Sequence, residues 1–166
     1  YKITSDHVLA RLANHNDIVT ATTDFDQHPL LINLQNGYYD LEQDQFYDSD
    51  PKKRFLCQFR TKYIPEAKPE KWLKFLETIF EGDKERIEYI QKLVGISLTG
   101  KADFQAVIFC FGDGRNGKST FIETLRLLFG DYFGKITSET LLSRWEYGGN
   151  TTDYDMADLF DKRMVV

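Results

Sequence analysis

Apolar side chains recur along this chain with two different periods. From Trp72 to Phe80 and from Ile87 to Leu98 they return every three to four positions, which places them on one face of a helix. Between Leu30 and Leu41 they form two short runs around Asn36-Gly37, the pair that most readily adopts the type I′ turn of a tight hairpin. The pattern predicts a β-hairpin followed by two helices that pack as an antiparallel pair. The helical positions expected in the core are Trp72, Phe75, Leu76, Ile79 and Phe80 in the first helix and Ile87, Ile90, Leu93, Val94 and Leu98 in the second.

Two weaker patterns flank the hairpin. Ser5 and Asp6 can cap a helix, and the apolar residues that follow them predict a short one. Residues 53–63 partly alternate between apolar and polar side chains, with Phe55 and Phe59 on the same side. This alternation is compatible with a third strand.

The second half of the chain begins with an apolar run that ends in glycine. Phe104 to Phe111 predicts a buried strand, and Gly117 to Phe129 predicts an amphipathic helix that Gly130 ends. Asp161 to Val166 ends in another β-prone run, which predicts a second parallel strand beside the first. The expected buried face of the helix comprises Phe121, Leu125, Leu128 and Phe129.

The loop between the predicted strand and helix satisfies the pattern G-x-x-x-x-G-K-[ST], which cradles phosphates in P-loop NTPases. Glycines at 112, 114 and 117 let the backbone take positive φ, so that successive amides can point at an anion beside the helix N-terminus. Lys118 supplies a positive charge for the β- and γ-phosphates, and Ser119 a hydroxyl ligand for Mg²⁺. A glycine-rich turn with an incidental lysine is the alternative. The four fixed positions coincide by chance only about once in a few hundred chains of this length.

The sequence thus predicts an ATP site that uses Mg²⁺, with Lys118 as the catalytic group and Ser119 as the metal ligand. The predicted nucleotide-binding residues are Gly112, Asp113, Gly114, Arg115, Asn116, Gly117, Lys118, Ser119 and Thr120.

Composition narrows the class of protein. With 166 residues, 42% hydrophobic and 28% charged, the chain is typical of a globular domain and not of disordered or fibrous proteins. Its two widely separated cysteines indicate neither a disulfide framework nor a zinc site. No apolar run reaches the roughly 18 residues that span a membrane, so we expect a cytoplasmic protein without a membrane partner.

The charge is unevenly distributed. The net charge of −5 argues against a surface that is basic throughout, yet residues 48–74 carry 8 basic and 4 acidic side chains. Such a segment could contact a nucleic-acid backbone. The alternative is an ordinary solvated face.

Several stretches resemble one known family in their order and spacing. These are Asn33 to Leu41, Trp72 to Leu76, Ile87 to Gly95, Leu98 to Gly100, Phe111 to Leu125 and Asp161 to Val166. On these residues the chain resembles the phage and plasmid primase–helicases of helicase superfamily III, the group that includes the poxvirus helicase–primase.

The resemblance implies an α/β protein with three parts. Residues 1–67 would form an N-terminal mixed α+β region with the hairpin, residues 68–100 the helical pair, and residues 101–166 the first part of a truncated P-loop NTPase core with parallel strands. It also implies ATP-driven unwinding of DNA during replication by a homo-hexamer. The family's acidic motif, sensor residue, arginine finger and DNA-contacting hairpin would follow Val166, and a primase domain would precede Tyr1. We therefore expect a fragment that hydrolyses little ATP.

Two other functions fit the same loop. One is a different P-loop phosphotransferase or kinase, against which the hundred residues before the loop count, because a kinase usually begins near its phosphate loop. The other is a non-enzymatic adaptor or DNA-binding module with a vestigial loop. The intact Gly112, Gly117, Lys118 and Ser119 count against degeneration.

Overall fold

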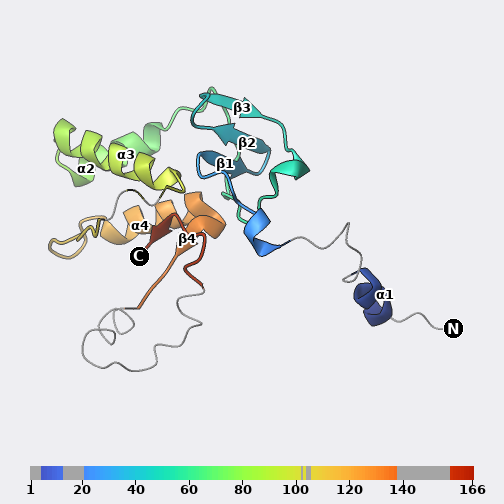
Figure 1. Cartoon of the computed structure of the whole chain (residues 1–166). Coiled ribbons are helices and arrows are strands. Elements are labelled where there is room, and N and C mark those ends of the chain that lie inside the picture. The colour runs from blue at the N-terminus through green and yellow to red at the C-terminus, as the bar shows by residue number, and fades with distance from the viewer. Residues whose placement is uncertain (1–4, 13–20, 102, 104–105, 138–157) are drawn as a thin grey trace.

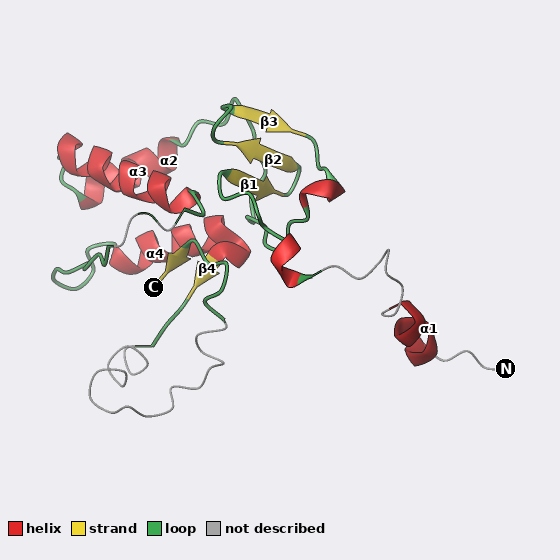
Figure 2. Cartoon of the chain, in the orientation of Figure 1, coloured by secondary structure: helices red, strands yellow, loops and turns green. Residues whose placement is uncertain are grey.

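A computed structural model describes residues 5–12, 21–101, 103, 106–137 and 158–166 (Figure 1). The fold is mixed α and β, as predicted (Figure 2). Its helices are α1 (Ser5–Leu12), α2 (Glu70–Ile79), α3 (Lys84–Leu98) and α4 (Lys118–Phe129). Its strands are β1 (Leu31–Leu34), β2 (Gly37–Asp40), β3 (Gln45–Tyr47), β4 (Phe133–Gly134) and β5 (Met164–Val165), and short 3₁₀ turns lie at Thr22–Asp24, Pro51–Lys53 and Gly130–Tyr132.

The predicted hairpin is formed by β1 and β2, but its turn differs by one residue from the prediction. Leu34 pairs with Gly37, so Gln35 and Asn36 make the turn and the type I′ turn expected at Asn36-Gly37 is wrong. The Asn36 side chain instead accepts a hydrogen bond from the backbone N–H of Tyr63 at 2.8 Å and donates one to the Tyr63 carbonyl at 3.0 Å. A distant part of the chain therefore sets the position of the turn.

The third strand is β3, not residues 53–63. β3 pairs antiparallel with β2. Residues 54–63 form no strand. Side chains occupy some of their backbone donors: Asp26 accepts from the N–H of Leu56 at 2.9 Å, and Asp131 from that of Gln58 at 3.2 Å. The predicted alternation is nevertheless confirmed, since Phe59 is 1% exposed between exposed Gln58 and Arg60.

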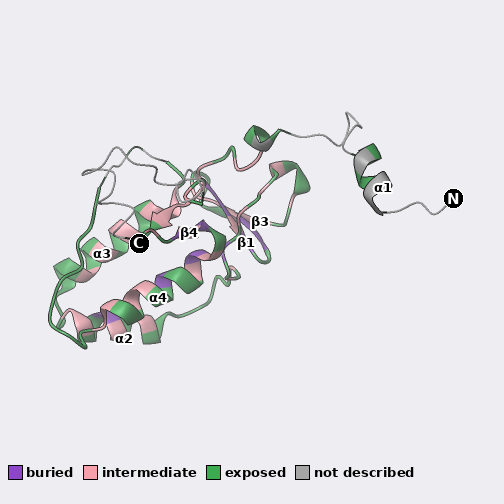
Figure 3. Ribbon diagram, turned by 90° about the horizontal axis from the view of Figure 1, so that it is seen from below, coloured by how far each residue is buried: buried purple, intermediate pink, exposed green. Residues whose placement is uncertain are grey.

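The helices lie where the apolar spacing predicts them. In α2 the predicted apolar stripe is buried or half-buried, with Leu76 fully buried. The Asp83 side chain caps α3 by accepting from the N–H of Arg86 at 3.0 Å, and Gly130 ends α4 with a positive φ of 57°. Figure 3 shows buried and half-buried residues along α2 and α4. The predicted helix after Ser5 is present as α1, with Val8, Leu9 and Leu12 exposed.

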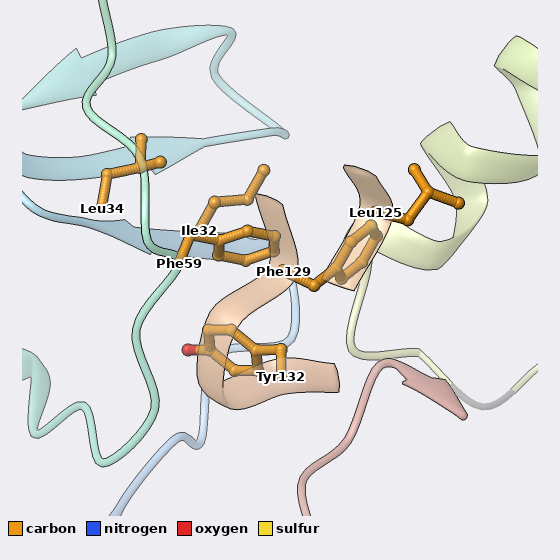
Figure 4. Packing of buried hydrophobic residues seen from close by; sticks show 6 residues of the cluster. All are labelled: Ile32, Leu34, Phe59, Leu125, Phe129 and Tyr132. Carbon is orange, nitrogen blue, oxygen red and sulfur yellow. The ribbon is translucent and has the colours of Figure 1, made fainter. Parts of the chain in front are cut away.

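One core connects the hairpin to α4 (Figure 4). The Phe59 ring lies 5.2 Å from that of Phe129 and 4.9 Å from that of Tyr132, measured between ring centroids. Ile32 and Leu34 reach the same cluster from β1, and half-buried side chains of α3 pack against it. The N-terminal sheet and the helix that follows the glycine-rich loop are therefore held together by shared apolar contacts.

The strand predicted at Phe104 to Phe111 is wrong for the residues that can be described. Residues 106–111 form no strand, and Val107, Phe109 and Phe111 are 80%, 82% and 92% exposed. A buried strand needs partners for its backbone groups. Its expected neighbour, β5, pairs in parallel with β4 instead, and no other described segment pairs with residues 106–111. A parallel sheet built on this run is absent from the described ranges.

The described helices include none that is both long and apolar enough to cross a bilayer.

An arginine anchors the start of β5. Arg163 donates through Nη1 to the Leu98 carbonyl at the end of α3, at 2.5 Å, and through Nη2 to the Leu31 carbonyl of β1, at 2.8 Å. Its guanidinium lies 4.4 Å from the centre of the Tyr132 ring. Burial lowers the pKa of Arg163 and raises the pKa of Tyr132. The side chain thus joins α3, β1 and β5 at one point.

Replacing Arg163 with methionine is expected to lower the free energy of unfolding by about 2 kcal/mol, because two carbonyls lose their donor and the cation–π contact disappears. The control is Arg126→Met, which breaks only an exposed ion pair with Glu123 and should cost much less stability than Arg163→Met. Urea denaturation measures both. Equal losses in the two variants would show that the Arg163 contacts add no stability.

Candidate phosphate-binding site

The loop from Gly112 to Gly117 turns sharply through residues with positive φ. Gly112, Arg115 and Gly117 have φ of 146°, 64° and 85°. The prediction that Gly114 takes a positive φ is wrong, because Arg115 adopts the left-handed conformation in its place. Arginine tolerates this conformation less well than glycine.

The N-terminus of α4 is open to an anion. The helix begins at Lys118 after Gly117, and no described side chain caps it. Its first turn contains no acidic residue, while Ser119 and Thr120 are exposed on it. The free N–H groups and the positive end of the helix dipole therefore favour a bound negative group here.

Lys118 folds back over the loop. Its Nζ donates to the carbonyl of Gly112 at 2.7 Å, the carbonyl of Asp113 at 3.1 Å and the Oδ1 of Asn116 at 2.7 Å. Among the described residues no carboxylate pairs with it. The ammonium is satisfied by neutral acceptors, so its charge remains available to an anion.

The predicted residues Gly112 to Thr120 form one continuous unit, but sequence reasoning missed the support beneath it. Gly117 faces α2: a Cβ on this glycine would lie 2.6 Å from Cγ2 of Ile79 and 3.3 Å from Cε2 of Phe75. One turn into α4, the Phe121 ring stacks on Trp72 of α2 with centroids 5.6 Å apart. The aromatic stripe of residues 72–80 was predicted to be core, but nothing in it indicated that it supports the loop.

Replacing Gly117 with alanine is expected to cost about 1–3 kcal/mol, because the new Cβ meets Ile79 and the residue must keep a positive φ. Thermal unfolding provides the measurement. Gly114→Ala is the control, because a Cβ at that position meets nothing within 4 Å and Gly114 is not among the residues with positive φ.

A double variant separates the two causes. In Gly117→Ala/Ile79→Ala the clash with Ile79 disappears while the backbone strain remains, so the double variant should lose less stability than the sum of the two single variants. Strict additivity would mean that the loop and α2 are not in contact.

The described residues contain no cluster of three or more His, Cys, Asp or Glu side chains that could hold a metal ion. Asp161, expected to lead into the acidic motif, has a raised pKa because of partial burial. It lies before β5, in the 158–166 segment.

An open glycine-rich loop, a helix N-terminus and a lysine together are typical of an anion-binding site. Among the comparisons with known proteins, the family match lies in another part of the chain. Residues 4–81 match the family described as D5 N terminal like. The resemblance to the primase–helicases that include the poxvirus helicase–primase is thereby confirmed.

Individual relatives agree with this match. The chain is 30% identical over 137 residues to the "Putative helicase L207/L206" of Acanthamoeba polyphaga mimivirus, an alignment that covers 80% of this chain and 14% of that protein. It is 25% identical over 166 residues to "Primase D5" of fowlpox virus, covering 93% of this chain and 20% of the relative. It is 27% identical over 142 residues to "Uncoating factor OPG117" of monkeypox virus, covering 79% and 18%. The chain thus spans at most a fifth of the length of these relatives.

Proposed function

We propose that this chain carries the ATP-binding loop of an ATP-driven DNA helicase that acts in replication. The observation that carries the proposal is the position of Lys118, whose ammonium is held by three neutral acceptors beside the uncapped N-terminus of α4. A phosphate chain would offer this ammonium charged oxygens in place of neutral ones. Charge-assisted hydrogen bonds are roughly twice as strong as neutral ones, which favours the exchange.

Different residues of the loop would bind different parts of the nucleotide. The backbone from Gly112 to Gly117 would enclose the β-phosphate, and Lys118 would contact the β- and γ-phosphates. Ser119, exposed on the first turn of α4, would hold Mg²⁺, which when bound neutralises charge on the phosphates. Hydrolysis also requires a group that orients water, and we assign none in this chain.

The assignment to DNA unwinding rests on the relatives. Proteins named putative helicase and primase align with most of this chain. Their alignments, of 137 and 166 residues, are longer than the family match at residues 4–81, which spans 78 residues. For the full-length protein we propose the assembly that the family forms, a homo-hexamer around DNA. The lysines at 68, 71 and 74 are exposed and would be available for a DNA contact.

We assign a role to each of the three parts expected from the sequence. Residues 1–67 and 68–100 would support residues 101–166, the start of the P-loop ATPase.

Isothermal titration of the chain with ATP and with AMP, in the presence of Mg²⁺, tests the proposal. We expect ATP to bind more tightly, because only ATP has β- and γ-phosphates for the loop. ATP binding no tighter than AMP would contradict an ATP site. For the full-length protein, ATP hydrolysis stimulated by single-stranded DNA separates a helicase from a kinase, which would phosphorylate a small acceptor instead.

A further inference from the structure

Asn116 lies across the glycine-rich loop, between Gly112 and Lys118. Its Oδ1 accepts from Lys118 Nζ at 2.7 Å. Its Nδ2 lies so close to Gly112 that a Cβ on that glycine would collide with it, and the same Cβ would lie 3.7 Å from Lys118 Nζ. The amide of Asn116 and the ammonium of Lys118 therefore share the space that a side chain at position 112 would fill.

Asn116 differs from the other two acceptors of Lys118. The carbonyls of Gly112 and Asp113 belong to the backbone and can move only with it. The Asn116 amide is the one side-chain acceptor that the described residues give to Lys118. A substitution at 116 can thus remove one support of the ammonium while the others stay in place.

The chemistry of the amide also matters. An amide oxygen holds an ammonium without neutralising it, whereas a carboxylate at the same distance forms an ion pair that competes with any incoming anion. Lys118 is thus held in place while the positive charge of its ammonium stays unpaired among the described residues.

We propose that Asn116 is the positioning residue for Lys118: it holds the ammonium at the loop, where the β- and γ-phosphates of a nucleotide would bind. This inference rests on the proposed ATP site. Asn116 acts through Lys118 and not through a bond of its own to the reacting phosphate. A Cβ at Gly112 would displace the Asn116 amide, and the φ of 146° at this position also favours glycine.

The test compares affinities for ATP and AMP in the presence of Mg²⁺, measured by isothermal titration of the whole chain. The ratio of the AMP and ATP dissociation constants isolates the contribution of the β- and γ-phosphates, which a general loss of structure would not change selectively. The variants are Asn116→Ala, Asn116→Asp and Lys118→Ala. Gln91→Ala is the matched control, because it removes an exposed amide from α3. Circular dichroism confirms that each variant is folded.

Asn116→Ala is expected to lower the ratio roughly three- to ten-fold, the effect of one lost hydrogen bond, with AMP affinity unchanged. Asn116→Asp should lower it further, since the carboxylate neutralises Lys118, and added salt should reduce the difference between the two variants. Gln91→Ala should retain the full ratio.

The outcomes that overturn the inference differ from those that overturn the ATP site. If Lys118→Ala lowers the ratio and Asn116→Ala does not, Asn116 does not position the lysine. Equal weakening of ATP and AMP by Asn116→Ala would leave Asn116 with a merely structural role. If the unmodified chain shows no preference for ATP over AMP, the ATP site itself is wrong and the inference falls with it.

Discussion

Replacing Lys118 with alanine is expected to weaken ATP binding by roughly 10- to 150-fold, the range that corresponds to the loss of a hydrogen bond to a charged group. The reason is the geometry of the loop, which holds the ammonium beside the open N-terminus of α4 without a carboxylate partner among the described residues. Binding of a fluorescent ATP analogue measures the loss. AMP should bind the variant and the unmodified chain about equally.

Lys92→Ala is the matched control. Lys92 is an exposed lysine of α3 that pairs with Glu88, so its removal changes the net charge by the same amount without touching the loop. We expect its ATP affinity and thermal midpoint to be unchanged. If both lysine variants weakened ATP binding equally, the effect would be one of overall charge, and a vestigial loop would become the better explanation.

Replacing Phe129 with alanine is expected to cost about 3–5 kcal/mol of unfolding free energy, the usual cost of removing a fully buried aromatic ring. The side chain is 0% exposed and packs against Phe59 in the core that joins the hairpin to α4. A domain is typically stable by about 5–15 kcal/mol, so this variant should lose a large share of its stability. Chemical denaturation with urea, followed by circular dichroism, measures the change.

Phe160→Ala provides the comparison, because Phe160 is 74% exposed. Its substitution should change the unfolding free energy by less than about 0.5 kcal/mol. A small loss in both variants would mean that α4 and the N-terminal sheet do not share the core seen here.

The features predicted correctly from the sequence are local ones. The helices α2, α3 and α4 follow from apolar spacing within each segment, and Gly130 ends α4 with a positive φ that suits glycine. The alternating burial around Phe59 is local too, although it belongs to an extended segment and not to a strand.

The features predicted wrongly depend on distant parts of the chain. Asn36 bonds to Tyr63 and so moves the hairpin turn by one residue. The run from Phe104 to Phe111 has the composition of a strand, but a strand exists only where another pairs with it. Composition cannot supply that partner, and the described residues contain none.

The candidate site shows the same division. The positions of the glycines, Lys118 and Ser119 can be read from a motif because phosphate chemistry requires those residue types at that spacing. The motif does not reveal that Arg115 takes the left-handed conformation in place of Gly114, or that Lys118 rests on Asn116. The conformation of Arg115 and the contact between Lys118 and Asn116 both depend on the three-dimensional path of the loop, which the motif does not specify.

The contact between Gly117 and α2 limits how the loop can move. A Cβ at Gly117 would fall within 2.6 Å of Ile79, so the backbone at the helix end of the loop already lies against α2. A rotation there has to displace either α2 or the whole of α4. The helix end of the loop therefore has no free space toward α2, whereas the residues at its Gly112 end are exposed and are held by Lys118 and Asn116.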